Sequence, residues 1–278
     1  MNEIIVVNKE KDYTSRDVVN KLTHILGTKK VGHTGTLDPI ATGVLVCLTG
    51  KYTKLVDLII SYEKEYIAEI KLGIKTDTLD ILGNVIEKCD VEPIDKQIMV
   101  DVLNSFLGVY EQVVPKYSAV KINGKKLYEY ARNNEEVILP KRMVEIKEIE
   151  LINYEKDIIK FRVIVSKGTY IRSLISDICD KLGTCGTMNS LIRTKQGKFK
   201  IEDSYLLDNI KGKKYKSLKL EDVLDLEIIC LDDKMYKKVI NGSKLELNKE
   251  GYVLFKKDDE NIALYYFEDN LGRIKILF

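Results

Sequence analysis

The residues best suited to chemistry lie in one short segment that combines glycines and threonines with a histidine, a proline and a single acid. It reads Lys30-Val31-Gly32-His33-Thr34-Gly35-Thr36-Leu37-Asp38-Pro39-Ile40-Ala41-Thr42-Gly43. Pro39 biases Asp38 towards an extended backbone, and glycine permits turns and close approach to a ligand, so we expect a rigid loop. No second carboxylate lies nearby in the sequence to share a proton. The pattern indicates that Asp38 serves as a nucleophile or as an oriented hydrogen-bond acceptor.

Other interpretations of this segment remain open on the residues alone. Aspartate before proline often forms a turn, and Gly/Thr clusters often only shape a loop. A phosphate-binding loop is excluded because the spacing Gly-x-x-x-x-Gly-Lys-Ser/Thr is absent. An aspartyl-phosphate enzyme would also use a loop aspartate, but it would need a second nearby aspartate to help hold Mg²⁺.

A second run that could do chemistry is Ser166-Lys167-Gly168-Thr169-Tyr170-Ile171-Arg172. It opens an expected helix whose apolar residues share one face and which ends at Gly183. The helix macrodipole disfavours Arg172 in the first turn, so the arginine needs another reason to be there. A bidentate pair with a carboxylate or a phosphate would supply it. The alternative is an arginine that faces solvent.

The first segment, from Gly32 to Pro39 and then Ala41-Thr42-Gly43, resembles the signature of the TruB family of tRNA pseudouridine-55 synthases. The Lys-Gly-Thr-Tyr-Ile-Arg run resembles a second signature of that family. A third stretch, residues 112–132, matches it at Pro115, Tyr117, Ser118, Ala119, Lys121, Gly124, Tyr128, Ala131 and Arg132. The resemblance extends in order over about the first 200 residues.

The resemblance implies a fold, a reaction and a partner. The pattern alone predicts α+β, and the family fold adds a mixed, mainly antiparallel sheet with flanking helices. The implied activity is that of an isomerase, a tRNA pseudouridine(55) synthase, which breaks the N–C1′ bond of uridine 55 in the T loop and rejoins the ring through C5. It uses no cofactor and no metal, and its partner is the T-arm stem-loop of tRNA. A monomer is expected.

The family also implies roles for individual residues. A base in a folded loop must be flipped out before an enzyme can reach it. Asp38 would attack C1′ or otherwise assist cleavage, Arg172 would pair with Asp38, and Tyr66 would stack on the uracil and take the C5 proton. The residues expected to bind the substrate are His33, Tyr66, Tyr170, Leu191 and Lys9. The sequence leaves both cleavage routes open.

The loop after Lys9 departs from the family pattern. The family has Lys-Pro there and a glycine two residues later, whereas this chain has Glu10 and Asp12. Lys9 itself is in place, and the conformation of the loop is open.

Regular elements should hold these segments in position. A helix should begin at Thr14 or Ser15 and end at Gly27, since a capping residue precedes an apolar face and glycine follows it. From residue 66 to 72 apolar and polar side chains alternate, which predicts a half-buried strand carrying Tyr66 on its buried side. Further strands are expected at residues 4–7, 44–48, 144–151 and 158–165, and further helices at 54–60 and 94–106.

The chain has 278 residues and a formal charge of +2, so its overall charge does not argue for a polyanionic partner. The charge is uneven, however, because residues 193–219 contain nine Lys/Arg against three Asp/Glu. The tail alternates as short strands would and resembles a small PUA-type RNA-binding domain. We therefore expect a catalytic domain at residues 1–225 and a PUA-like domain at residues 226–278.

Five scattered cysteines and two histidines argue against a zinc site and against a disulfide framework. No secretory signal and no apolar run long enough to span a bilayer is apparent, so the cytoplasm is the expected location. Two rival functions stay open: a non-catalytic RNA-binding or RNA-folding protein, and a synthase with another RNA target. Intact Asp38, Tyr66 and Arg172 argue against the first, and the two long signatures argue against the second.

Overall fold

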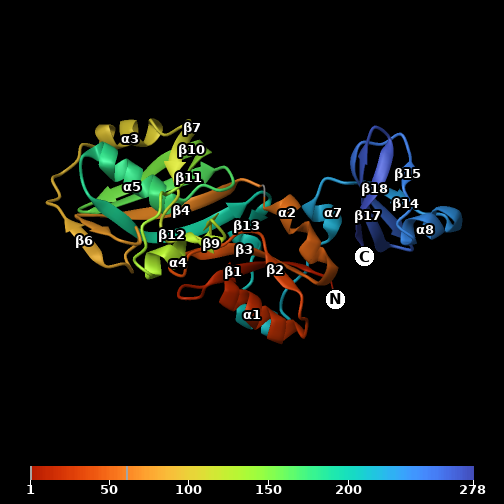
Figure 1. Cartoon of the computed structure of the whole chain (residues 1–278). Coiled ribbons are helices and arrows are strands. Elements are labelled where there is room, and N and C mark those ends of the chain that lie inside the picture. Colours follow the sequence, from red (N-terminus) through yellow and green to blue (C-terminus); the bar gives the residue numbers. More distant parts are fainter. Residues whose placement is uncertain (1, 61) are drawn as a thin grey trace.

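The computed structural model describes residues 2–60 and 62–278. Among these residues the larger sheet has nine strands, and its main path runs β1-β3-β12-β4-β11-β10-β7, with β2 beside β3 and β13 beside β12 (Figure 1). Its strands are β1 Ile4–Lys9, β2 Val31–His33, β3 Thr42–Thr49, β4 Lys64–Leu72, β7 Gly108–Val113, β10 Lys141–Glu155, β11 Ile158–Val165, β12 Gly186–Gln196 and β13 Phe199–Lys200. Strands β3 and β12 pair in parallel, and the other described pairs of this sheet are antiparallel. The predicted mixed, mainly antiparallel sheet is confirmed.

Helices flank this sheet, as predicted. Helices α3 Lys96–Asn104 and α5 Ile171–Leu182 lie against each other and against β10 and β12, while α1 Ser15–Leu26 packs beside β2 and α6 Leu207–Lys211 (Figure 1). Helix α1 begins and ends where its sequence predicts. The Thr14 hydroxyl accepts a hydrogen bond from the Asp17 amide and the Asp17 carboxylate accepts one from the Thr14 amide, and Gly27 ends the helix at φ +62°.

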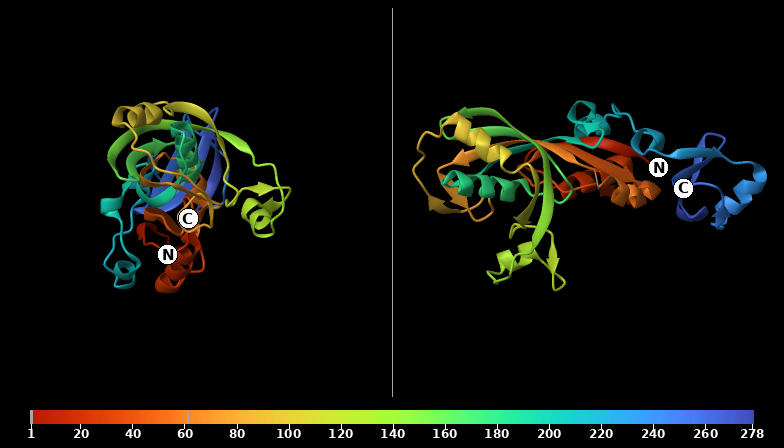
Figure 2. Two further views of the ribbon diagram at one scale, coloured as in Figure 1. Left: turned by 90° about the vertical axis from the view of Figure 1, so that its left-hand side faces the viewer. Right: turned by 90° about the horizontal axis from the view of Figure 1, so that it is seen from above.

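One predicted helix has a different form. The helix expected at residues 54–60 is a 3₁₀ turn, η1 Gly50–Leu55, that continues into the short α2 Val56–Ile59. A connection between β7 and β10 projects from the sheet and contains β8 Lys121–Ile122, β9 Lys125–Lys126 and α4 Leu127–Arg132 (Figure 2). The strand carrying Tyr66 alternates as expected, with Tyr66, Ala68, Ile70 and Leu72 buried.

The C-terminal part forms a second sheet in the order β14-β16-β17-β18-β15. Its strands are β14 Glu227–Cys230, β15 Leu245–Glu246, β16 Gly251–Lys257, β17 Glu260–Glu268 and β18 Leu271–Leu277, and α8 Asp233–Ile240 packs on it. This sheet lies at one end of an elongated molecule, next to α7 Leu220–Val223 (Figures 1 and 2). The predicted β-rich tail is confirmed, and we propose that its boundary with the catalytic domain falls between residues 225 and 226.

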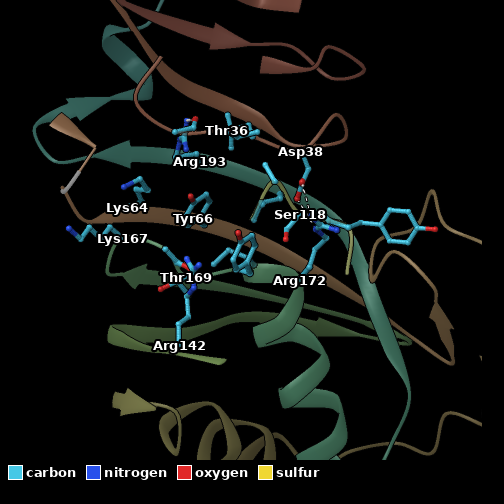
Figure 3. Close-up of a pocket in the computed structure, with 18 of the residues that line it drawn as sticks. Thr36, Asp38, Lys64, Tyr66, Ser118, Arg142, Lys167, Thr169, Arg172 and Arg193 are labelled. Atoms are coloured by element: carbon cyan, nitrogen blue, oxygen red, sulfur yellow. Dashed lines mark hydrogen bonds and ion pairs between the residues drawn. The ribbon is translucent and has the colours of Figure 1, made fainter. Parts of the chain in front are cut away.

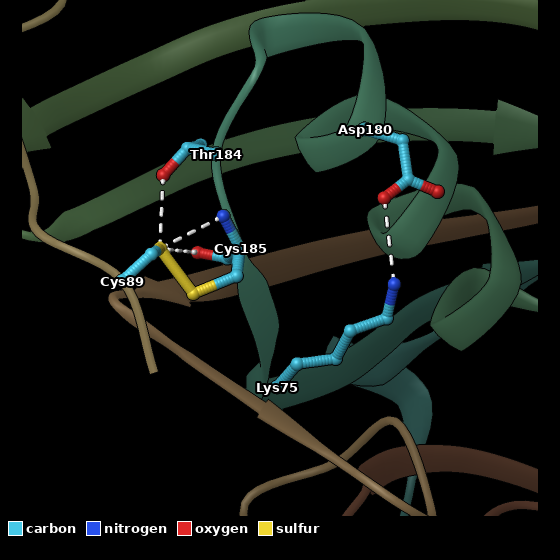
Figure 4. Close-up of a disulfide and its surroundings, with 5 residues drawn as sticks. All are labelled: Lys75, Cys89, Asp180, Thr184 and Cys185. Atoms are coloured by element: carbon cyan, nitrogen blue, oxygen red, sulfur yellow. Dashed lines mark hydrogen bonds and ion pairs between the residues drawn. A yellow bond between two sulfur atoms is a disulfide. The ribbon is translucent and has the colours of Figure 1, made fainter. Parts of the chain in front are cut away.

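A disulfide joins Cys89, which follows the hairpin of β5 Ile74–Thr76 and β6 Val85–Lys88, to Cys185 just before β12 (Figure 4). Both cysteines bond to the backbone of Gly73: the Gly73 amide donates to the Cys185 carbonyl, and the Cys89 amide donates to the Gly73 carbonyl. Their Cα atoms therefore lie 6.1 Å apart, although 96 residues separate them in the sequence. The sequence argued against a disulfide framework, yet this one pair forms, because spacing along the chain does not report proximity in the folded protein.

Candidate active site

A cavity of about 910 Å³ opens beside β4 and β12, and residues from six separate segments line it. They include Asp38, Tyr66, Ser118, Tyr170, Arg172 and Leu191. Figure 3 shows Asp38, Ser118 and Arg172 on one side of Tyr66, and Lys64, Lys167 and Arg193 on the other. The fold thus brings together most of the residues that the two sequence signatures singled out.

The loop that carries Asp38 is held by hydrogen bonds to the start of the chain. The Ser15 hydroxyl accepts from the Leu37 amide at 2.8 Å, and the amide of Ala41 donates to the Asp38 carbonyl at 3.0 Å. After the loop, Gly43 pairs with Arg193 in the parallel ladder, where a Cβ on Gly43 would lie 2.2 Å from the Arg193 carbonyl oxygen. Only glycine allows the two strands to approach this closely.

Arg172 and Asp38 form a bidentate ion pair. Arginine Nε donates to one carboxylate oxygen at 2.9 Å and Nη2 donates to the other at 3.0 Å. The same guanidinium donates to the carbonyls of Thr78 and Tyr117, at 2.9 and 3.0 Å. The arginine side chain is only 6% exposed, whereas that of Asp38 is 29% exposed. The predicted pairing is confirmed, and it explains why a cation occupies the first turn of α5.

Tyr66, Tyr170 and Leu191 line the cavity as expected. Tyr66 points from β4, paired with Arg193 of β12, and Leu191 lies two residues earlier on β12, paired with Ala68. Tyr170 immediately precedes α5, and the guanidinium carbon of Arg142 lies 5.5 Å from the centre of its ring. These side chains offer an apolar and aromatic wall on which a planar base can stack.

The backbone of Tyr170 is clamped by Gln112, which the sequence did not single out as functional. The Gln112 side-chain oxygen accepts from the Tyr170 amide at 2.8 Å, and its Nε2 donates to the Tyr170 carbonyl at 3.1 Å and to the Tyr110 hydroxyl at 2.6 Å. Gln112 is completely buried. It therefore holds the residue before α5 much as a neighbouring strand would.

Lys9 and His33 lie outside the described cavity lining. Lys9 is fully buried, and its ammonium donates to the carbonyls of Glu10, Tyr13 and Pro39. Its assignment to substrate binding therefore needs correction: Lys9 supports the Asp38 loop through the Pro39 carbonyl. Burial, followed by the charges of Arg193 and Arg16, lowers the pKa of His33, and its Nδ1 accepts from the Gly35 amide at 3.2 Å.

The unusual loop after Lys9 has a defined conformation. Asp12 adopts φ +69°, in the region that favours glycine, and its amide donates to the Pro39 carbonyl at 2.9 Å. At the position where the family pattern has glycine, this chain has Asp12, and the backbone there is left-handed.

Sequence reasoning also missed Ser118 and Lys64 as cavity residues. Ser118 is 6% exposed, and its hydroxyl oxygen is buried without a hydrogen-bond partner among the described residues. It follows Tyr117, whose carbonyl accepts from Arg172. A buried hydroxyl without a partner in a cavity wall is a candidate contact for a bound ligand. The sequence feature that pointed to Ser118 was its position in the stretch 112–132, which matches the family.

Comparisons with known proteins point to the family that the sequence motifs resemble. Residues 23–171 match the family model described as TruB family pseudouridylate synthase (N terminal domain). A protein of Mesoplasma florum named tRNA pseudouridine synthase B is 42% identical over 96% of this chain and 94% of its own length. One of the same name from Caldanaerobacter subterraneus is 43% identical over 86% of this chain and 84% of its own length.

Solved structures share the fold. The chain matches one in a crystal structure of a Cbf5-Nop10-Gar1 complex with a TM-score of 0.71 and 25% identity, over 99% of this chain and 83% of that one. A second match, at TM-score 0.69 and 24% identity, comes from an H/ACA RNP bound to a substrate RNA containing 2′-deoxyuridine, and covers the same shares of the two chains. Because the family model spans more than half of the chain and the relatives match along most of it, the chain belongs to the TruB family of pseudouridylate synthases.

Proposed function

We propose that this chain isomerises uridine 55 in the T loop of tRNA to pseudouridine. The observation that carries the proposal is the bidentate pair of Asp38 and Arg172 in a cavity lined by Tyr66. The relatives from Mesoplasma florum and Caldanaerobacter subterraneus are named tRNA pseudouridine synthase B, which supports tRNA as the substrate.

The chemistry follows from the positions of these groups. The target uridine leaves the stack and enters the cavity, where its base stacks on Tyr66. Asp38 attacks C1′ or assists cleavage of the N1–C1′ bond, while the bidentate pair with Arg172 holds its carboxylate in position. The uracil turns, C5 bonds to C1′, and the C5 proton leaves with Tyr66 as the base. N1 gains a proton, so atoms balance and no redox change occurs.

The remaining residues act on binding. Tyr170 and Leu191 line the uridine pocket, and His33 is a flat group suited to take the place of the extruded base. Lys9 acts through the loop that holds Asp38. We further propose that the enzyme acts as a monomer in the cytoplasm, where tRNA is modified. Within the described residues, no helix is both long enough and apolar enough to cross a membrane.

The test is product formation on an unmodified tRNA transcript carrying tritium at C5 of uridine, with EDTA present. The wild-type chain should release tritium and form pseudouridine at the T-loop position, and a transcript with cytidine at that position should release none. Asp38→Asn should abolish product, while the matched control Asp203→Asn, at an exposed position, should not. A wild-type chain that binds the transcript without forming product would instead be a non-catalytic RNA-binding relative.

A further inference from the structure

One wall of the cavity is built from cations. Lys64 comes from β4, Arg193 from β12, and Lys167 from the turn before α5. Figure 3 shows these three side chains on the side of Tyr66 away from Asp38 and Arg172. Lys64 is 8% exposed and Arg193 1% exposed, so two of the three charges are almost completely removed from solvent.

Lys64 and Arg193 converge on one point of the backbone. A Cβ built on Gly35 would lie 3.5 Å from Nη1 of Arg193 and 3.6 Å from Cε of Lys64. Burial, followed by the charges of Arg193 and Lys167, lowers the pKa of Lys64 to about 8. The three cations therefore repel one another in a partly desolvated place.

Carbonyl dipoles hold the two buried cations, but no carboxylate neutralises them. Lys64 donates to the carbonyls of Ile60 and Tyr62 at 3.0 and 2.7 Å. Arg193 donates to those of Val44 and Gly35 at 2.6 and 3.1 Å. Across residues 2–60 and 62–278 no Asp or Glu pairs with Lys64, Lys167 or Arg193. The acid among the described lining residues, Asp38, is engaged by Arg172.

Buried cations are costly unless an anion compensates them. An anionic ligand can reach these three cations, because all three side chains line the open cavity. We propose that Lys64, Arg193 and Lys167 form a subsite for one backbone phosphodiester that flanks the target uridine. The proposal rests on the proposed function, since it places that phosphate relative to a base stacked on Tyr66.

The geometry favours a flanking phosphate over other ligand groups. Lys64 lies two residues before Tyr66 on the same face of β4, and Arg193 is the cross-strand partner of Tyr66. An anion at the subsite is therefore adjacent to the stacked base, as the phosphate of the same nucleotide must be. A uracil carbonyl is neutral and would leave the charges uncompensated, and a guanidinium fork and two ammonium groups match phosphate oxygens.

The test uses a T-arm RNA hairpin in which a neutral methylphosphonate replaces one of the two linkages that flank the target uridine. Dissociation constants are measured with EDTA over a series of KCl concentrations for the wild type, Lys64→Met and Lys167→Met. The matched control is Lys160→Met, a lysine of β11 that pairs with Glu69 and whose side chain is partly exposed. Lys167 is exposed, so its variant keeps the native fold even where Lys64→Met is destabilised.

One of the two methylphosphonates should weaken wild-type binding by about tenfold, as loss of a charged hydrogen bond predicts. Lys64→Met and Lys167→Met should lose less than about twofold on the same RNA, because the interaction is already absent. The slope of log Kd against log [KCl] should fall by about 0.7 for each variant and stay unchanged for the control.

Two results would overturn the subsite. Either both methylphosphonate hairpins bind the wild type as tightly as the parent RNA, or the variants show the wild-type penalty and salt slope. Either result with normal pseudouridine formation removes the subsite and leaves the proposed function intact. Loss of hairpin binding by the wild type removes both proposals. Wild-type binding with the expected coupling but without product retains the phosphate subsite and removes the catalytic function.

Discussion

Replacing Arg172 with lysine separates charge from geometry in the pair with Asp38. The guanidinium makes four hydrogen bonds, two to the Asp38 carboxylate and one each to the carbonyls of Thr78 and Tyr117. A lysine ammonium keeps the charge, but it is a single point with three donors and cannot span both carboxylate oxygens and both carbonyls. Arg172→Lys therefore keeps a positive charge beside Asp38 but leaves its carboxylate poorly oriented.

The expected magnitude follows from the bonds that are lost. A hydrogen bond to a charged group is worth about 1.5–3 kcal/mol, so loss of the bidentate geometry should raise the barrier by about 2–4 kcal/mol. At about 1.4 kcal/mol for each factor of ten, the single-turnover rate should fall by about 30- to 1000-fold. The free energy of unfolding should fall as well, because the two loop carbonyls lose a buried donor.

Single-turnover tritium release at saturating enzyme is the assay, and circular dichroism with urea unfolding checks that the variant is folded. Arg162→Lys is the matched control, because Arg162 also pairs with two carboxylates, those of Glu65 and Glu148, at a partly exposed place on the sheet. The control should stay within about twofold of the wild-type rate. If folded Arg172→Lys keeps more than about a third of the wild-type rate, the bidentate geometry does not contribute to catalysis and the reasoning fails.

Three further predictions concern the surroundings of the site. Asp12→Gly should raise the free energy of unfolding by about 0.5–1 kcal/mol in a urea titration, because residue 12 has φ +69°, a backbone conformation that strains aspartate but not glycine. An unchanged or lower value would show that the backbone at Asp12 is not strained. Gln112→Ala should lower the catalytic rate about tenfold, because Tyr170 loses the hydrogen bonds that hold its backbone. The control Gln97→Ala, on the exposed face of α3, should keep the wild-type rate. Equal rates for the two variants would show that Gln112 does not position Tyr170 for catalysis. Burial raises the pKa of Asp177 from 3.8 to about 6, so the folded state binds the extra proton and wild-type stability falls as the pH rises through that window. Asp177→Asn should therefore gain stability relative to wild type between pH 4 and 6 and keep the gain at pH 8; a pH-independent difference would contradict this.

The parts of the structure that could be predicted are those that neighbouring residues determine. The cap at Thr14, the end of α1 at Gly27 and the alternation through Tyr66 are local patterns, and each lies where its sequence places it. The pairing of Asp38 with Arg172 spans 134 residues and was expected only through the family resemblance, supported by the misplaced charge in the first turn of α5.

The parts that could not be predicted depend on proximity between distant segments. Nothing in the sequence distinguishes Lys64 from the many other lysines. It is buried near Arg193 only because β4 pairs with β12 in the folded sheet. Lys9 was expected near the substrate, yet its ammonium turns inward to three carbonyls. No local pattern reports the direction in which a long side chain turns.

The disulfide between Cys89 and Cys185 makes a covalent ring out of the middle of the chain. Arg172 lies on that ring, whereas Asp38 and Tyr66 lie in the part of the chain before it. The exposed stretch around Ile138, which is 91% exposed, is also part of the ring. A protease that cuts there opens the ring without separating the two fragments. The nicked, oxidised protein therefore keeps both halves of its Asp38–Arg172 pair in one covalent molecule, and it divides into two polypeptides on a denaturing gel only after reduction.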